Sequence, residues 1–102
     1  AQTRRELRKT GGHEGIALLE VPDSPGLVAL RALSVLVNEA GHAAADGVAE
    51  LAEIDRALQL GLSWAVGPKR LQAWLAPALQ CTLRALEARD GRDVYTPAPG
   101  IF

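Results

Sequence analysis

The chain has 102 residues, of which 48% are hydrophobic and 23% are charged, and its formal net charge is −1. This length and composition are typical of one soluble globular domain and exclude a disordered or fibrous chain. The near balance of charge argues against a nucleic-acid-binding protein, because such proteins usually carry a basic excess or a basic face.

The first 21 residues predict a linker arm. Thr10–Gly15 is glycine-rich and typical of a flexible turn, and the residues before it are either irregular or helical around Arg4–Lys9. Ile16–Val21 has the composition of a short strand, which Pro22 would end. We therefore expect two parts, a linker arm at residues 1–21 and one helical domain at residues 22–102.

A long helix is expected to begin at the start of this domain. Asp23 or Ser24 can cap a first helical turn, and Pro25 suits the first helical position because its missing N–H would be unpaired there. The helix should continue to about Asp46 and end at Gly47. Its polar residues form one narrow stripe on an otherwise apolar helix, at positions Arg31, Ser34, Asn38 and His42. Such a helix is buried on most sides and forms the centre of a domain.

Three shorter helices are expected to follow, at about Leu51–Leu60, Pro68–Ala76 and Pro77–Asp90. Gly61 and Gly91 would end the first and the last of them. The tail Arg92–Phe102 contains two prolines, so it should be irregular and either cross the domain as a strap or hang free. The predicted fold is all-α, a small helical bundle built round one long buried helix.

The histidines and the thiol do not make a self-sufficient site. Glu39 and His42 are three residues apart and could hold one edge of a metal ion, but no second pair of ligands is present. We expect His42 to be hydrogen-bonded or partly exposed, and Cys81 to pack inertly beside Leu79 and Leu83. One thiol excludes an internal disulfide, which favours a cytoplasmic protein. The sequence thus predicts no catalytic, cofactor-binding or metal-binding residues.

Residues 53–71 resemble a helix, a glycine turn and a second helix, the pattern of some DNA-binding proteins. A helix that reads DNA needs several basic and amide side chains toward the groove. The available ones are Lys69, Arg70 and Gln72. The acidic residues across the turn are better explained by the positive end of the helix that they begin; they are Glu50, Glu53 and Asp55.

The order of several short blocks resembles a known family. The blocks read DSPGLV, LVNEA, DGVA, EIDRALQLG and GP, at residues 23–28, 36–40, 46–49, 53–61 and 67–68. They are similar to consecutive blocks in the C-terminal helical domain of 3-hydroxyacyl-CoA (3-hydroxybutyryl-CoA) dehydrogenases, over residues 20–76, with weaker agreement at Tyr95–Pro97. The resemblance implies a domain that follows an NAD-holding domain, covers the substrate and forms the dimer. The parent enzyme would oxidise 3-hydroxyacyl-CoA to 3-ketoacyl-CoA in fatty-acid or phenylacetate degradation.

Two departures from the family matter. A strand followed by G-x-G-x-x-G, the mark of the family's nucleotide-binding domain, does not occur in this sequence. In the family, the catalytic His–Glu pair belongs to that domain. Leu30 stands where the family has an asparagine near the reacting carbonyl, and leucine can neither donate nor accept a hydrogen bond. The P-G-L-x-x-L-R opening is similar to the second of two tandem helical domains in enzymes of the phenylacetate type. We interpret the chain as such a second copy.

These features lead to a set of expectations about partners. The chain itself should bind no cofactor and be inactive alone, whereas the parent enzyme would use NAD. Its partners would be the upstream nucleotide-binding domain, a second copy in a homodimer and acyl-CoA as a ligand. No nucleic acid and no membrane are expected. The pairing surface is predicted at Leu27, Leu30, Leu33, Val37, Leu79, Leu83 and Leu86. The alternatives are a stand-alone non-catalytic interaction module or a helix-turn-helix DNA binder.

Overall fold

The computed structural model describes residues 2–13 and 15–102. In chain order it contains α1 (Gln2–His13), α2 (Ala29–Ala45), α3 (Leu51–Leu62), α4 (Pro68–Asp90) and a short 3-10 helix, η1 (Asp93–Tyr95). No strand occurs in these residues, and the predicted all-α fold is confirmed.

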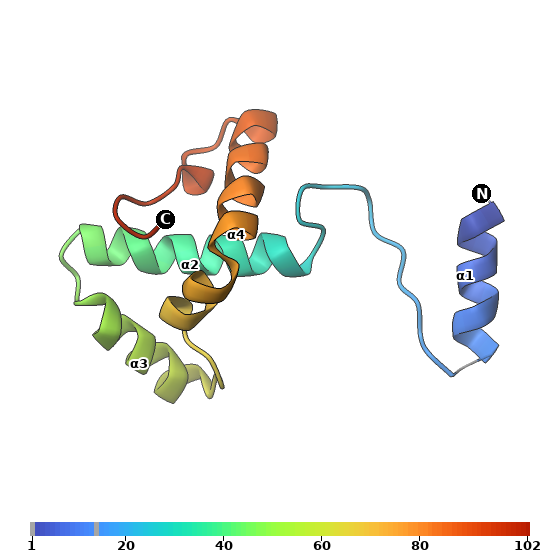
Figure 1. Cartoon of the computed structure of the whole chain (residues 1–102), viewed down its shortest axis with the longest axis horizontal. Helices are drawn as coiled ribbons and strands as arrows, with labels where there is room; N and C mark the ends of the chain where they lie inside the picture. The colour runs from blue at the N-terminus through green and yellow to red at the C-terminus, as the bar shows by residue number, and fades with distance from the viewer. Residues whose placement is uncertain (1, 14) are drawn as a thin grey trace.

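The body of the molecule is formed by α2, α3, α4 and the residues that follow them. Helices α2 and α4 cross and pack on each other, α3 contacts both, and the C-terminal strap, residues 92–102, returns across α2 (Figure 1). The strap supplies Ala98 and Ile101 to a core cluster with Val37 and Leu79. It also supplies Tyr95 to a second cluster on α4. The tail is therefore a strap that closes the core, and not a free end.

The start of α2 differs from the prediction. Pro25 is not the first helical residue, because residues 25–28 form a turn and the helix begins at Ala29. In this turn Gly26 has φ +75° and Leu27 has φ +51°, both in the left-handed region. A Cβ at Gly26 would lie 2.6 Å from the methyl carbon of Thr82, so the turn brings the backbone too close to α4 for any larger residue. The predicted end is confirmed, with Gly47 at φ +76°.

Helix α3 begins with the acidic residues that the sequence assigned to it. The Glu50 and Glu53 side chains form a capping box with the backbone of the first turn. The helix runs past Gly61 to Leu62, and Ser63 ends it at φ +55°. Two residues more than predicted are therefore helical.

Helix α4 joins two segments that were predicted to be separate helices. Pro77 lies inside it, so the prediction of a new helix at Pro77 is wrong. Proline removes one backbone hydrogen bond, that to the carbonyl four residues earlier. Both Pro77 and Ala73 are exposed, so water can satisfy the carbonyl that is left over. The apolar residues on the other side continue across the proline and hold the two parts as one helix.

The arm stands away from the body. Among the residues that the structure describes, helix α1 contacts no other helix, and residues 16–24 form an extended segment on the way to α2 (Figure 1). The Cα radius of gyration is 16.7 Å, against about 13 Å for a compact domain of this length. The extended segment is held to α1 by a 2.7 Å hydrogen bond from Ile16 N to Gly11 O and by an ion pair of 2.7 Å between Arg8 and Glu20.

Two predictions for the arm need correction. Residues 10–13 continue α1 and are not a turn, while Ala1 and Glu14 lie outside the described residues. The strand predicted at Ile16–Val21 does not form, although the segment is extended. A strand needs a neighbour for its backbone groups, and the described residues offer this segment none.

Candidate functional site

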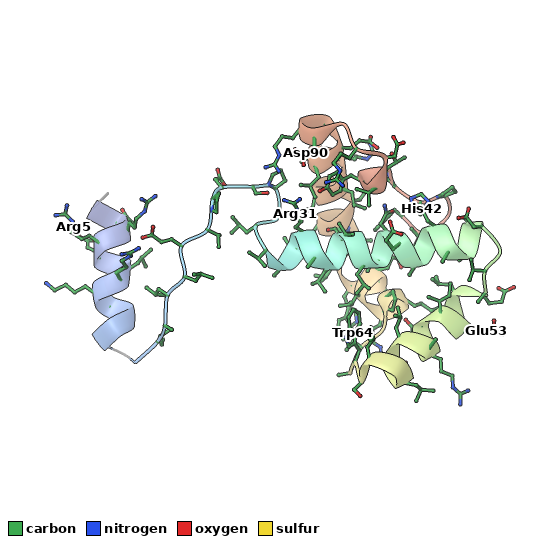
Figure 2. The ribbon with its side chains drawn as sticks, turned by 180° about the vertical axis from the view of Figure 1, so that it is seen from behind. Arg5, Arg31, His42, Glu53, Trp64 and Asp90 are labelled. Carbon is green, nitrogen blue, oxygen red and sulfur yellow. The ribbon has the colours of Figure 1, made fainter. Side chains whose placement is uncertain are left out.

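The polar stripe of α2 faces the C-terminal strap. Arg31 and His42 lie on the side of α2 that carries Asp90 and the strap, whereas Glu53 and Trp64 lie on the other side (Figure 2). Arg31 donates to the phenolic oxygen of Tyr95 at 2.7 Å. The stripe that the sequence singled out is therefore part of the internal seam of the domain, and the apolar residues of α2 pack on α4, on α3 and on the strap.

Asn38 is the centre of this seam. Its amide nitrogen donates to the carbonyl oxygens of Val94 at 3.3 Å and Thr96 at 2.9 Å. Its Oδ1 accepts from the backbone N–H of Ala98 at 2.7 Å. Asn38 is fully buried, and both of its N–H donors are used to hold the strap. The side chain has no free donor for a ligand, so its role is structural.

His42 extends the same seam by one turn. Its Nε2 lies 2.8 Å from the carbonyl oxygen of Thr96, which can only accept, so Nε2 must carry a proton. The prediction of a hydrogen-bonded, partly exposed histidine is confirmed. Glu39 is exposed. In the described part of the chain, no group of three or more His, Cys, Asp or Glu side chains is placed to hold a metal ion.

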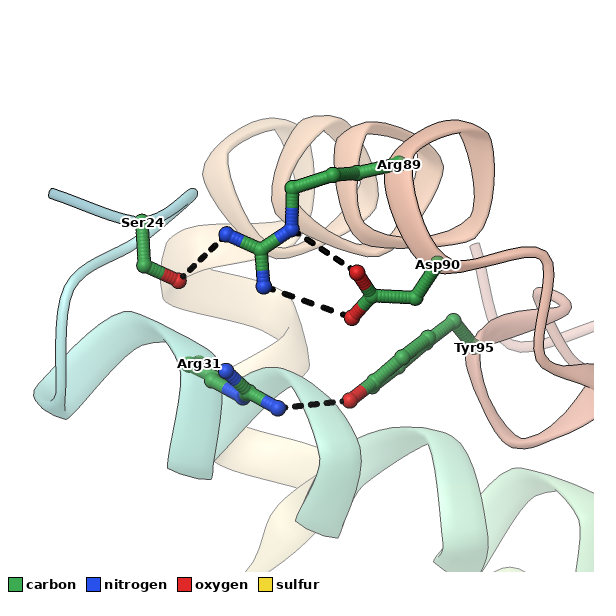
Figure 3. A network of polar contacts seen from close by, with 5 residues as sticks. All are labelled: Ser24, Arg31, Arg89, Asp90 and Tyr95. Carbon is green, nitrogen blue, oxygen red and sulfur yellow. Dashed lines mark hydrogen bonds and ion pairs between the residues drawn. The ribbon is translucent and has the colours of Figure 1, made fainter.

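A second polar network joins the start of the domain to the end of α4 (Figure 3). Arg89 donates to both carboxylate oxygens of Asp90, at 2.9 and 3.3 Å, and to Ser24 Oγ at 3.2 Å. This hydrogen-bonded pairing lowers the pKa of Asp90 and raises the pKa of Arg89. The network ties the turn before α2 to the C-terminal end of α4.

The predicted pairing surface is mostly the domain's own core. Four of its residues have no exposed surface at all and cannot contact a partner; they are Val37, Leu79, Leu83 and Leu86. Leu30 and Leu33 are half-buried against the first core cluster. Leu27 is 53% exposed and remains available. The prediction was wrong for the four buried residues because α2 and α4 pack on each other instead of on a second copy.

Other apolar side chains are exposed instead. Leu60 and Leu62 at the end of α3 are 73% and 55% exposed, and Trp74 in α4 is 62% exposed. The guanidinium of Arg70 lies 5.8 Å from the Trp74 ring centroid. Helical spacing places Trp74 beside Leu71 and Leu75, which are half-buried. Helical spacing alone could not show that the Trp74 side chain is exposed to solvent, because burial depends on how the other helices pack on α4.

The structure also bears on the DNA-binding alternative and on the thiol. The carboxylate of Asp55 accepts from the backbone N–H of Lys69 at 2.8 Å, at the first turn of α4. A negative charge at this helix end would repel the phosphates of DNA and argues against a reading helix. Cys81 is exposed, which corrects the expectation that it packs among leucines. No helix in the described residues is long and apolar enough to cross a membrane.

Comparisons with known proteins agree on one family. The model of the 3-hydroxyacyl-CoA dehydrogenase C-terminal domain matches residues 26–99. The chain is similar to 3-hydroxyadipyl-CoA dehydrogenase of Escherichia coli (strain K12), with 36% identity over 82% of this chain and 18% of the relative. It is also similar to 3-hydroxybutyryl-CoA dehydrogenase of Clostridioides difficile, with 45% identity over 79% of this chain and 29% of the relative.

A solved structure shares the fold. The crystal structure of (S)-3-hydroxybutyryl-CoA dehydrogenase from Ralstonia eutropha matches with a TM-score of 0.82 and 25% identity, over 98% of this chain and 36% of that chain. The match therefore includes α1 and the arm as well as the body. The chain spans between 18% and 36% of the lengths of these three proteins.

Proposed function

Since this chain belongs to the 3-hydroxyacyl-CoA dehydrogenase family as a C-terminal domain, we propose that it is the helical part of a larger NAD-dependent enzyme. That enzyme would oxidise 3-hydroxyacyl-CoA to 3-ketoacyl-CoA, and this domain would pack against its nucleotide-binding domain and help to close the acyl-CoA cleft. The single observation that carries the proposal is the match of 98% of the chain, with its detached arm, to a solved dehydrogenase.

The exposed surface of the arm supports a partner domain. Leu19 is 88% exposed, and Ile16 and Leu18 are 59% and 48% exposed. These side chains lie on an extended segment whose composition is that of a strand. An exposed apolar segment of this kind is typical of a surface that another part of a protein covers. The upstream nucleotide-binding domain would cover it, so that residues 1–21 act as the junction between the two domains.

The body of the domain favours a structural role in which the domain supplies no catalytic group. Leu30, at the family's asparagine position, is half-buried against the core and offers no polar group. Asn38 and His42 hold the strap. We propose on this basis that the chain is a second tandem copy, whose function is packing, and that NAD and the catalytic groups belong to the upstream part of the enzyme.

Pairing with another copy of the domain is proposed through the surface that the structure leaves open. Leu60 and Leu62 lie at the end of α3 and Trp74 lies in the second turn of α4, and all three are more than half exposed. Replacing Leu60 and Trp74 by lysine should lower the association constant measured by sedimentation and leave the core intact. A chain that is monomeric at tens of micromolar would contradict this part of the proposal.

The enzymatic proposal is tested on the whole polypeptide that contains this domain. With acetoacetyl-CoA and NADH, the whole protein should consume NADH, and the 102-residue chain alone should not. Deletion of residues 22–102 should reduce the turnover or the oligomeric state of the whole protein. A whole protein that dimerises but shows no NADH-linked turnover with any 3-hydroxyacyl-CoA would support the interaction module instead.

A further inference from the structure

A cavity of about 560 Å³ opens between the end of the arm and the start of α2. One wall is apolar and is formed by Val21, Leu27 and Val28. The other wall carries the guanidinium groups of Arg31 and Arg89. The polar wall is the network drawn in Figure 3. A cavity with one apolar and one cationic wall fits a ligand that is itself half apolar and half anionic.

Positive charge exceeds negative charge around this cavity. Arg31 is half-buried and donates to the Tyr95 hydroxyl, and within residues 2–13 and 15–102 it has no ion pair with an acidic side chain. Arg89 is paired with Asp90, and the guanidinium of Arg92 lies 6.0 Å from the Tyr95 ring centroid. The lining itself carries two arginines, Arg31 and Arg89, and one carboxylate, that of Asp23. The charge of Arg31 also acts on Asp90, but among the described residues Arg31 has no carboxylate hydrogen-bonded to it, in contrast to Arg89.

The N-terminus of α2 adds to the same field. Its cap residue is Val28, which lines the cavity, and no side chain caps the helix or places an acidic group in its first turn. The positive end of the helix dipole therefore has no acidic side chain in its own first turn, which also contains Arg31.

Leu27 adds an exposed side chain to the apolar wall of the cavity. It is held at φ +51°, a conformation that leucine rarely adopts, and its side chain is 53% exposed. The fold gains little from a strained and exposed leucine. A ligand with an aliphatic chain would gain contact area from it.

We infer that this cavity binds a small carboxylate with a short aliphatic chain. The carboxylate would accept hydrogen bonds from Arg31 beside the N-terminus of α2, and the chain would pack on Leu27, Val28 and Val21. The apolar wall favours a carboxylate attached to a hydrocarbon over inorganic phosphate. The inference stands on this chain alone and does not depend on the proposed dehydrogenase function.

The test is a titration of the ¹⁵N-labelled 102-residue chain at pH 7 with hexanoate, hexanamide, acetate and inorganic phosphate. Hexanoate should shift the amides of residues 27–32 saturably and bind at least about tenfold more tightly than each of the other three. Equal binding of hexanamide or acetate would overturn the inference, since charge or chain would then contribute nothing. Tighter binding of phosphate would overturn it in favour of a general anion site, and the absence of saturable shifts would overturn it outright.

Three variants separate binding from folding. Arg31→Gln should weaken hexanoate binding about tenfold, whereas Arg56→Gln, on the exposed face of α3, should leave it unchanged. Leu27→Asn shortens the apolar wall at a position that asparagine adopts easily, so affinity should fall several-fold while stability is kept or raised. If Arg31→Gln does not fold, Leu27→Asn decides the matter. A folded variant at either position with undiminished affinity would refute the site.

Discussion

Replacing Asn38 by alanine removes the side chain that holds the C-terminal strap on α2. Three hydrogen bonds are lost, two that Asn38 donates to carbonyl oxygens and one that it accepts from the Ala98 N–H. The contacts that remain between strap and helix are chiefly those of Ala98 and Ile101 with the core, the hydrogen bond of His42 to Thr96 and the hydrogen bond of Arg31 to Tyr95.

The magnitude follows from what is left unpaired. The Ala98 N–H lies in a buried hydrogen bond, and a buried donor without a partner costs about 1–3 kcal/mol. The Val94 carbonyl loses its donor at a partly buried position, for about 1 kcal/mol. Thr96 O still accepts from His42, so its loss is small. The free energy of unfolding should fall by about 3 kcal/mol, a large share of the roughly 5–15 kcal/mol of a small domain.

Urea denaturation measures the global loss, and native-state hydrogen exchange measures the local one. The Ala98 amide should exchange at least about tenfold faster in Asn38→Ala, because its acceptor has gone. Glu39→Ala, on the exposed side of the same helix, is the matched control and should change the free energy of unfolding by less than about 0.5 kcal/mol. Asn38→Asp keeps an acceptor for Ala98 but places a charge against two carbonyl oxygens, so it should also destabilise the domain. A loss below about 1 kcal/mol in Asn38→Ala, with unchanged exchange at Ala98, would refute the assignment of Asn38 as the clasp of the strap.

Three further predictions concern single positions. Ser34→Ala should raise the melting temperature by about 4–8 °C, because its fully buried hydroxyl has no hydrogen-bond partner among the described residues and its removal regains about 1 kcal/mol. A lower melting temperature would contradict this. Gly41→Ala should destabilise the domain by about 1–3 kcal/mol, since a Cβ there would lie 2.8 Å from strap side chains. Gly61→Ala, at a position with open space in α3, should stabilise it by about 0.5–1 kcal/mol. Urea denaturation of both variants measures the two changes, and equal changes would contradict the prediction. Asp90 should contribute stability that is complete above its ordinary pKa of 3.8 and is lost as the pH falls through its lowered pKa, so Asp90→Asn should flatten the acid limb of the stability profile, and an unchanged limb would contradict this.

The helix ends were predictable where a nearby glycine determines them. Helix α2 ends before Gly47 and α4 ends before Gly91, and both glycines have positive φ. Pro77 misled because proline is a common helix start, yet nothing before it can cap a helix, and Leu75 and Ala76 favour one. The turn at Gly26 was hidden for another reason. It depends on close approach to Thr82, a residue far along the chain.

The candidate site shows the same limit. Periodicity correctly placed Val37, Leu79 and Leu83 on apolar faces, but it cannot tell whether such a face meets its own chain or a second copy. The strand predicted at Ile16–Val21 is a similar case, because strand propensity describes a segment and not its neighbour. The network of Arg31 with Tyr95 joins residues 64 positions apart, and no local pattern contains that pairing.

The clasp of Asn38 on Ala98 has a consequence for how the polypeptide acquires its structure during synthesis. The two residues are separated by 60 positions, and helices α3 and α4 are made between them. At roughly 5–20 residues per second, a ribosome needs about 3–12 s to cover that distance. Through this interval a nascent α2 would keep its inward amide and serine hydrated, and the mature packing could only arise after Ala98 has cleared the exit tunnel.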